Sequence, residues 1–280
     1  MTKIKICGLS RPADIEIVNQ FLPDYIGFIF AKSRRLVSAE TAKELKKLLD
    51  PRIQAVGVFV NEDIDTIIRL CRCGGSAPAD RHNFNGAAGY GVEEADRHDP
   101  SEVTGLNLNE TIGYGAREED RYDHNQEVGY DSKEAVGYAS DLSEQNTAGR
   151  VIDIIQLHGD EDEAYIRRLK AEVSVPIIKA VRVRSSEDIH KAARLPCDFL
   201  LLDAYREDQY GGGGEVFDWT QIGRPNKPFF LAGGITPGNV PEAIERARPY
   251  GIDVSTGVES NGYKDPAKVK DMITKVRSVR

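Results

Sequence analysis

The 280-residue sequence lacks any run of about 18 apolar residues, and its N-terminus has no basic segment followed by an apolar one. We therefore expect neither a membrane span nor a signal peptide, and the expected location is cytoplasmic. Cysteine is also scarce. Cys7, Cys71, Cys73 and Cys197 show no disulfide-scaffold spacing, so the sequence predicts free thiols in a reducing compartment.

Paired metal-ligand motifs and a surplus of basic charge are absent as well. Cys71, Cys73 and His82 offer only three candidate ligands without the paired spacing of a zinc site, so we expect no metal ion. We expect no nucleic-acid or membrane partner.

The acidic charge lies mostly in one segment, residues 74–150. This segment holds 16 of the 45 acidic residues but only 6 of the 37 basic ones, which leaves the rest nearly neutral. Its apolar residues follow neither strand nor helix periodicity, and Gly-Tyr pairs begin at 89, 113, 129 and 137. The pattern predicts a disordered low-complexity insertion. A small folded element, or one that binds an unknown partner, is the alternative.

The remaining residues, 1–73 and 151–280, predict one α/β domain. Apolar runs with strand character cover 3–7, 25–30, 53–60, 152–158, 176–183, 198–203, 228–233 and 252–256. Their nearly continuous apolar character is typical of strands buried on both faces. Helical patterns alternate with them, and four of these helices are expected to begin at the N-cap residues Ser38, Ser185, Thr236 and Asp265.

Eight strands alternating with about eight helices predict a closed (β/α)8 TIM barrel, with the insertion between the third helix and the fourth strand. An open doubly wound sheet is disfavoured because no GxGxxG turn follows the first strand. Active sites of such barrels lie at the carboxyl ends of the strands. There the sequence carries Cys7, His158, Arg182 and Asp203, with Arg35 in the second loop.

Glycine-containing turns follow the last two predicted strands. Backbone N–H groups in such turns bind anions, and the loops after strands seven and eight are the usual phosphate site of this fold. The expected phosphate-binding residues are Gly233, Gly234, Ser255, Thr256 and Gly257. Tight turns without a ligand are the structural alternative. The sequence thus predicts a phosphorylated small-molecule substrate.

Several motifs occur in a specific order: KICG, SRR, GVFVN, QLHGDE, LLLD, GGGGEVFDW, LAGG and VSTGVE. Together they resemble the phosphoribosylanthranilate isomerase family of tryptophan biosynthesis, over residues 1–72 and 151–280. Thr256, where the family commonly has serine, and the run of four glycines at 211–214 depart mildly from the family pattern. The insertion is the large departure.

The resemblance implies an Amadori rearrangement, in which an aminoaldose opens and becomes an aminoketose. This chemistry requires neither a metal ion nor an organic cofactor. By match to the family, Asp203 is the general acid and Cys7 the general base. At pH 7 an ordinary Asp is mostly deprotonated and an ordinary Cys mostly protonated, so each group needs help from its surroundings.

The resemblance also assigns Arg35 to the anthranilate carboxylate or an adjacent anion, with a solvated surface arginine as the alternative. Arg182 is a weaker anion candidate. His158 is expected to line the site, although a hydrogen-bonded structural histidine fits nearly as well. Cys197 is assigned to core packing, and the acidic residues at 160–162 to the first turn of a helix.

Two other functions remain open at this stage. Another phosphate-binding barrel of tryptophan or histidine biosynthesis would share the glycine turns, but it would not be expected to place Cys7 and Asp203 at strands one and six. A scaffold whose acidic insertion recruits a partner would not need the polar residues at the strand ends.

Overall fold

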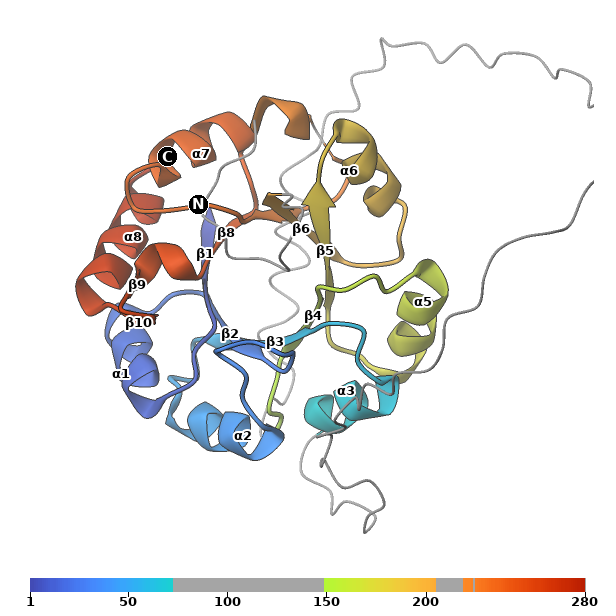
Figure 1. Ribbon diagram of the computed structural model, residues 1–280, viewed down its shortest axis with the longest axis horizontal. Helices are drawn as coiled ribbons and strands as arrows, with labels where there is room; N and C mark the ends of the chain where they lie inside the picture. Colours follow the sequence, from blue (N-terminus) through green and yellow to red (C-terminus); the bar gives the residue numbers. More distant parts are fainter. Residues whose placement is uncertain (73–148, 205–218, 224, 280) are drawn as a thin grey trace, which may run out of the picture. The chain divides into compact units, whose positions relative to one another are not determined.

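The structure is a computed structural model that describes residues 1–72, 149–204, 219–223 and 225–279. Within these ranges, eight parallel strands close into a barrel in which each strand pairs with the next and β1 pairs with β8 (Figure 1). The barrel strands are β1 (Lys3–Cys7), β2 (Tyr25–Ile29), β3 (Gln54–Phe59), β4 (Ile154–Leu157), β5 (Ile177–Val183), β6 (Phe199–Ala204), β7 (Phe229–Leu231) and β8 (Gly251–Val254). The predicted (β/α)8 fold is confirmed.

Helices surround the ring of strands (Figure 1). In the described ranges these are α1 (Pro12–Phe21), α2 (Ala39–Leu48), α3 (Ile64–Cys71), α5 (Glu163–Glu172), α6 (Ser186–Ala193), α7 (Val240–Ala247) and α8 (Pro266–Ser278). Two short 3₁₀ helices, η1 (Trp219–Ile222) and η2 (Thr256–Val258), follow β6 and β8. The strand-and-helix alternation read from the sequence is therefore present around the barrel.

Three of the four predicted N-caps lie where the sequence placed them. Ser38 accepts a hydrogen bond from the Thr41 N–H, Ser185 forms a capping box, and Asp265 accepts two backbone N–H groups of α8. The prediction at Thr236 was wrong, because α7 begins at Val240 with Asn239 before it.

The physical reason lies in the side chain of Asn239. It accepts from the Thr236 N–H and donates to the carbonyl of Gly234, at 2.8 and 2.9 Å. These bonds hold the intervening residues in a turn, and Pro241 instead occupies the first turn of the helix, where its missing N–H costs nothing.

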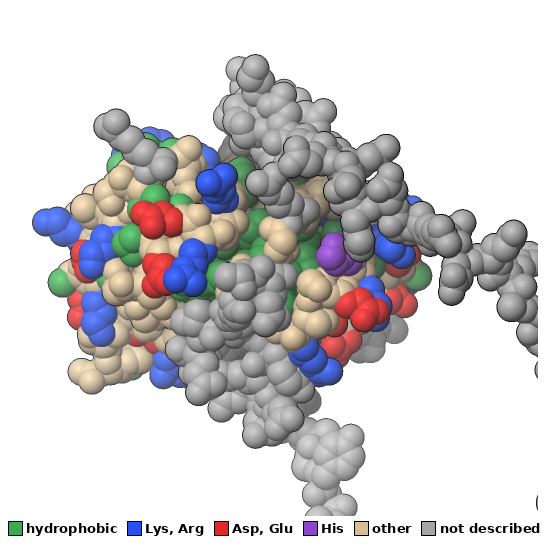
Figure 2. Space-filling model, turned by 90° about the horizontal axis from the view of Figure 1, so that it is seen from above, with side chains coloured by type: hydrophobic (Ala, Val, Ile, Leu, Met, Phe, Trp, Pro, Cys, Tyr) green, Lys and Arg blue, Asp and Glu red, His purple; other side chains and the backbone are tan. Residues whose placement is uncertain are grey.

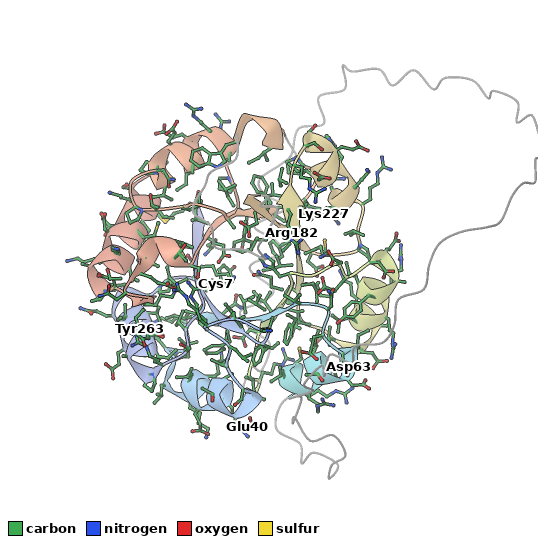
Figure 3. The ribbon with its side chains drawn as sticks, in the orientation of Figure 1. Cys7, Glu40, Asp63, Arg182, Lys227 and Tyr263 are labelled. Carbon is green, nitrogen blue, oxygen red and sulfur yellow. The ribbon has the colours of Figure 1, made fainter. Side chains whose placement is uncertain are left out.

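Side chains alternate between the inside of the barrel and the layer under the helices, as the period of two requires. On β1, Ile4 and Ile6 belong to the outer core, whereas Lys5 and Cys7 belong to the interior. Ile178 on β5 belongs to the inner cluster and Ala180 packs against it. By the same parity, Arg182 belongs to the inner face, and Figure 3 shows both Cys7 and Arg182 within the ring of helices.

Aromatic side chains fill the amino-terminal end of the barrel interior. Tyr25, Phe199, Phe230 and Tyr250 form edge-on and tilted contacts with ring centroids 5.1–5.9 Å apart. The two tyrosine hydroxyls hydrogen-bond to each other at 2.9 Å. This plug closes one end of the barrel and forms the floor beneath the polar residues at the other end.

A small antiparallel hairpin, β9 (Glu259–Ser260) and β10 (Tyr263–Lys264), follows η2. Its two turn residues, Asn261 and Gly262, both have positive φ, at 52° and 84°. An Asn-Gly pair is the strongest short signal for such a turn. The sequence reasoning missed this hairpin, although the signal was present.

The segment predicted as an insertion lies mostly outside the described residues, as do Cys73 and the glycine run at 211–214. Its flanks are described: the Val151 N–H donates to the Leu70 carbonyl at 3.2 Å. Leu70, near the end of α3, and Val151, shortly before β4, therefore lie side by side. The division into a barrel of 1–73 and 151–280 and an insertion of 74–150 stays a prediction.

The described surface carries charges of both signs. On the face in Figure 2, Lys and Arg side chains are interspersed with Asp and Glu side chains. Several form exposed pairs along a helix, such as Arg167 with Glu163 at 2.6 Å. None of the described helices has the length and apolar character needed to cross a membrane.

Candidate active site

A cavity opens at the carboxyl ends of the strands. Nine of the ten residues predicted for the site line it: Cys7, Arg35, His158, Asp203, Gly233, Gly234, Ser255, Thr256 and Gly257. Arg182 is not among the described residues that line the cavity, although it pairs in register with Asp203 on the neighbouring strand. Residues from six strands or the loops that follow them therefore meet at one mouth of the barrel.

Two glycines make room for the thiol and for Arg35. Gly27 on β2 pairs in register with Cys7, and a Cβ at residue 27 would lie 2.7 Å from Sγ. Gly8 has φ +81°, a conformation that favours glycine, and a Cβ there would overlap Cδ of Arg35. The glycine after Cys7 thus lets the chain turn at the strand end and lets Arg35 cross over it.

Cys7 is buried, and burial raises the pKa of its thiol above the ordinary value. The nearby carboxylate of Asp253 acts in the same direction, while the ammonium groups of Lys5 and Lys264 oppose it. The two ammonium groups favour the thiolate, but they do not outweigh the desolvation of the thiol.

Lys5 lies one layer below Cys7 and is completely buried. Its Nζ donates to Oε1 of Gln156 at 2.7 Å and to Oδ1 of Asp253 at 3.0 Å. Burial alone would lower the pKa of Lys5, but Asp253 and Cys7 together raise it above the ordinary value. Lys5 is therefore a cation in the barrel interior. The sequence reasoning missed it, although its spacing of two residues from Cys7 places both on one strand face.

His158 and Asp203 face each other across the cavity mouth. Nε2 of His158 lies 3.5 Å from Oδ2 of Asp203, and both side chains are largely buried. On the other side of the ring, Nδ1 lies 2.8 Å from Nε2 of Gln156. His158 thus lines the cavity and is also hydrogen-bonded, and its role in substrate binding stays a prediction.

Arg35 is held at the cavity by the buried carboxylate of Glu259. Nε and Nη2 of Arg35 donate to its two oxygens, each at 2.8 Å. The same carboxylate accepts from Arg34 at 2.6 Å and from Lys264, its cross-strand partner, at 2.7 Å. Burial by itself would raise the pKa of Glu259, but Arg35 and Lys264 bring it below the ordinary value.

This bidentate contact leaves Nη1 of Arg35 as the donor group that could meet a substrate anion. Glu259 and Lys264 were both missed from the sequence, because their roles depend on the Asn261-Gly262 hairpin that brings them together.

The two glycine turns adopt conformations that expose backbone groups. Gly233 and Gly234 have φ of +80° and +65°. At Gly257 a Cβ would overlap the carbonyl oxygen of Ile235, so the β8 turn packs against the β7 turn without space for a side chain. Close approach of these turns is what an anion cradle requires.

The acidic residues at 160–162 do not act together as a helix turn. Asp162 is the N-cap of α5 and accepts from the Tyr165 N–H. Glu161 is instead buried and pairs with Lys179 on β5 at 3.0 Å, while also accepting from the Asn61 N–H. The assignment of Glu161 to the helix turn was therefore wrong, because a buried lysine provides a closer partner than the helix end.

Among the described residues, no group of three or more His, Cys, Asp or Glu side chains is arranged to hold a metal ion. Of the three candidate zinc ligands, Cys73 and His82 lie outside the described ranges. Cys71 is a buried free thiol on α3, and Cys197 is likewise buried and free. Cys197 packs in the outer core, as predicted.

A closed (β/α)8 barrel with polar side chains converging on a cavity at the carboxyl ends of its strands is the architecture of a barrel enzyme. Which barrel enzyme is settled by sequence comparison. The chain belongs to the N-(5'-phosphoribosyl)anthranilate isomerase family, whose model matches residues 4–73 and 139–275.

Individual relatives agree with this assignment. The N-(5'-phosphoribosyl)anthranilate isomerase of Endomicrobium trichonymphae is 36% identical over 279 residues, covering all of both chains. That of Lachnoclostridium phytofermentans is 37% identical over 284 residues, covering 97% of this chain and 95% of the relative. The crystal structure of phosphoribosyl anthranilate isomerase from Thermotoga maritima is 25% identical, with a TM-score of 0.64 and 99% of each chain covered.

Proposed function

We propose that Cys7 and Asp203 perform the two proton transfers of the isomerisation for which the family is named. The chain is an isomerase of tryptophan biosynthesis. Its reaction is the Amadori rearrangement of N-(5-phosphoribosyl)anthranilate to 1-(2-carboxyphenylamino)-1-deoxyribulose 5-phosphate. The observation that carries the residue assignment is that a thiol and a carboxyl group face one cavity from β1 and β6.

The acid acts first. Asp203 donates its proton to the ribose ring oxygen, and the ring opens as the nitrogen lone pair forms a C=N bond at C1. Cys7 then removes the proton from C2, and the electron pair of that C–H bond moves to restore the amine as an enamine. Tautomerisation of the resulting enol gives the ketone. His158, 3.5 Å from Asp203, is placed to orient the acid.

The cavity offers matching contacts for the rest of the substrate. The turns at Gly233, Gly234 and 255–257 supply backbone N–H groups for the phosphate, and Nη1 of Arg35 can meet the anthranilate carboxylate. The walls also include Ile29, Val58 and Val60, which suit an aromatic ring. Arg182, on the strand beside Asp203, remains a candidate for a second anion contact.

The test is steady-state kinetics with freshly prepared N-(5'-phosphoribosyl)anthranilate, following loss of its fluorescence. Cys7→Ser and Asp203→Asn should each lower kcat by at least about 10²-fold, the lower end of what a positioned acid or base contributes. KM should change much less. Cys197→Ser, which removes a buried thiol far from the cavity in the outer core, is the matched control and should leave kcat unchanged.

The pH profile separates a base from a packing residue. Because burial raises the pKa of Cys7, the limb of the kcat/KM profile that reports this thiol should lie above about pH 8.5, the ordinary value for a thiol. Cys7→Asp should move this limb to lower pH. A Cys7→Ser enzyme with near-normal kcat at neutral pH would remove Cys7 from the mechanism.

A further inference from the structure

A chain of polar side chains connects the two sides of the barrel interior. It runs from Asp253 on β8 to Lys5 on β1, then to Gln156 on β4 and to His158 just after β4, and ends at Asp203 on β6. The successive separations are 3.0, 2.7, 2.8 and 3.5 Å. The mechanism above uses only the last of these residues as a proton donor, so the purpose of the others is open.

The chemistry of Lys5 fixes the direction of the hydrogen bonds from Lys5 through Gln156 to His158. A lysine ammonium has three donors and no acceptor, so the Gln156 side chain must present its oxygen to Lys5. Its NH₂ group then faces Nδ1 of His158, which must accept. A neutral imidazole carries one N–H, so the ring proton is on Nε2, the atom that faces Asp203.

We propose that Lys5 and Gln156 are positioning residues that keep His158 neutral, with its proton on Nε2 directed at Asp203. This inference rests on the proposed role of Asp203 as the acid. An imidazolium at this position would form an ion pair with Asp203 and hold it as a carboxylate, leaving no proton for the ribose ring oxygen. A neutral N–H orients the acid without that charge.

Asp253, Lys5 and Gln156 form a clamp on the His158 ring. The clamp resists reversal of its hydrogen bonds because Lys5 is charged and buried. Protonating Nδ1 would require the Gln156 amide to turn, which would set its NH₂ group against the ammonium of Lys5. That arrangement leaves buried donors without acceptors, and Lys5 is completely shielded from water. Asp253 completes the clamp, since its carboxylate keeps Lys5 charged and therefore unable to accept.

The first measurement is on the unmodified protein and needs no variant. Long-range ¹H–¹⁵N correlation NMR reports which imidazole nitrogen carries a proton, and a His158→Asn spectrum identifies this ring among the five histidines. At pH 7 we expect a neutral ring with the proton on Nε2. A proton on Nδ1, or on both nitrogens, would overturn the inference.

The second measurement reverses the hydrogen bond between residue 156 and His158 with a side chain of nearly the same shape. Gln156→Glu replaces the NH₂ group facing Nδ1 by an oxygen that accepts, so His158 should become protonated at Nδ1. We expect an imidazolium spectrum at pH 7 and a loss in kcat of at least about tenfold, which is part of the 10²–10⁴-fold that a positioned acid supplies. KM should change much less.

Gln20→Glu adds the same charge on the exposed face of α1 and should change neither the spectrum nor kcat. Lys5→Met tests the other end: without the ammonium, the Gln156 amide is free to turn, and the spectrum should show a mixture of tautomers. A Gln156→Glu protein with a normal thermal transition, an unchanged His158 spectrum and normal kcat would refute the clamp.

Failure of the inference and failure of the proposed function give different results. If Asp203 is not the acid, Asp203→Asn keeps its activity whatever the His158 spectrum shows. If Asp203 is the acid and the clamp acts through it, Gln156→Glu should add little further loss in an Asp203→Asn background. If Asp203→Asn is nearly inactive and the losses in kcat from Asp203→Asn and Gln156→Glu are fully additive, the clamp is rejected while the role of Asp203 as the acid stands.

Discussion

Replacing Glu259 by glutamine should destabilise the barrel and loosen the substrate site together. Its carboxylate is 5% exposed and accepts from Arg34, Arg35 and Lys264. Lys264 is 1% exposed; burial already lowers its pKa, and Glu259 is the carboxylate that opposes this shift. Arg35 would lose the bidentate contact that holds it across Gly8.

The expected loss follows from the burial of the pair. Removing one partner of a buried ion pair costs about 3–5 kcal/mol, because the other charge is left uncompensated. For a domain of roughly 150–250 residues this lowers Tm by roughly 6–20 °C. The exposed pair Glu163–Arg167, with side chains 53% and 67% exposed, provides the control. Glu163→Gln should cost less than about 0.5 kcal/mol.

Urea unfolding at pH 7 measures the loss, and substrate kinetics at the same pH should show a higher KM with a smaller change in kcat. A double variant, Glu259→Gln with Lys264→Met, should recover part of the stability, since the uncompensated ammonium is gone. A loss below about 1 kcal/mol for Glu259→Gln, as for a surface pair, would refute the reasoning.

The pH dependence gives an independent check on the same carboxylate. The pKa of Glu259 in the folded protein is lowered, so its contribution is present above the ordinary value of about 4.3 and is lost as the pH falls through the folded value. The difference in stability between parent and Glu259→Gln should therefore be constant near neutral pH and shrink below about pH 4.

Three further outcomes are expected. Gly27→Ala should lower kcat at least about tenfold and cost about 1–3 kcal/mol, because its Cβ would lie 2.7 Å from Sγ of Cys7; an unchanged kcat by the fluorescence assay would contradict this. Inorganic phosphate should compete with substrate, and Gly234→Asp should raise KM steeply; no competition at high millimolar phosphate would place the anion elsewhere. Joining Gly74 directly to Gly149 should leave kcat/KM within about tenfold of the parent, and a folded deletion protein with a hundredfold loss would show that the segment serves the active face.

The sequence was sufficient for the fold because local patterns and the fold agree. Continuous apolar runs predicted strands whose ends differ from the observed ones by only a few residues. The predicted N-caps Ser38, Ser185 and Asp265 are each followed by a helix. The start of α7 was misplaced because two prolines, Pro237 and Pro241, both carry the signal for a first turn. Only the side-chain bonds of Asn239 decide between them.

The strand-end rule found the candidate site, but it did not find what supports the site. Cys7, His158 and Asp203 are chemically conspicuous residues at strand ends. Lys5 and Gln156 lie inside strands, where a polar residue has no obvious use until the barrel is closed. Closure brings Lys5 within 2.7 Å of Gln156 although 151 positions separate them in the chain, and no pattern within either strand records that contact.

The two-residue period of a strand nevertheless links Lys5 and Gln156 to the residues of the candidate site. Lys5 precedes Cys7 by two residues on β1, and Gln156 on β4 precedes His158, the residue after that strand, by two residues. Each supporting residue therefore faces the same side as the residue above it. A slip of one residue in either strand would turn both members of a pair out of the interior together. The barrel therefore positions the thiol with its neighbouring cation, and the imidazole with the amide that orients it, by the same backbone geometry that closes the sheet.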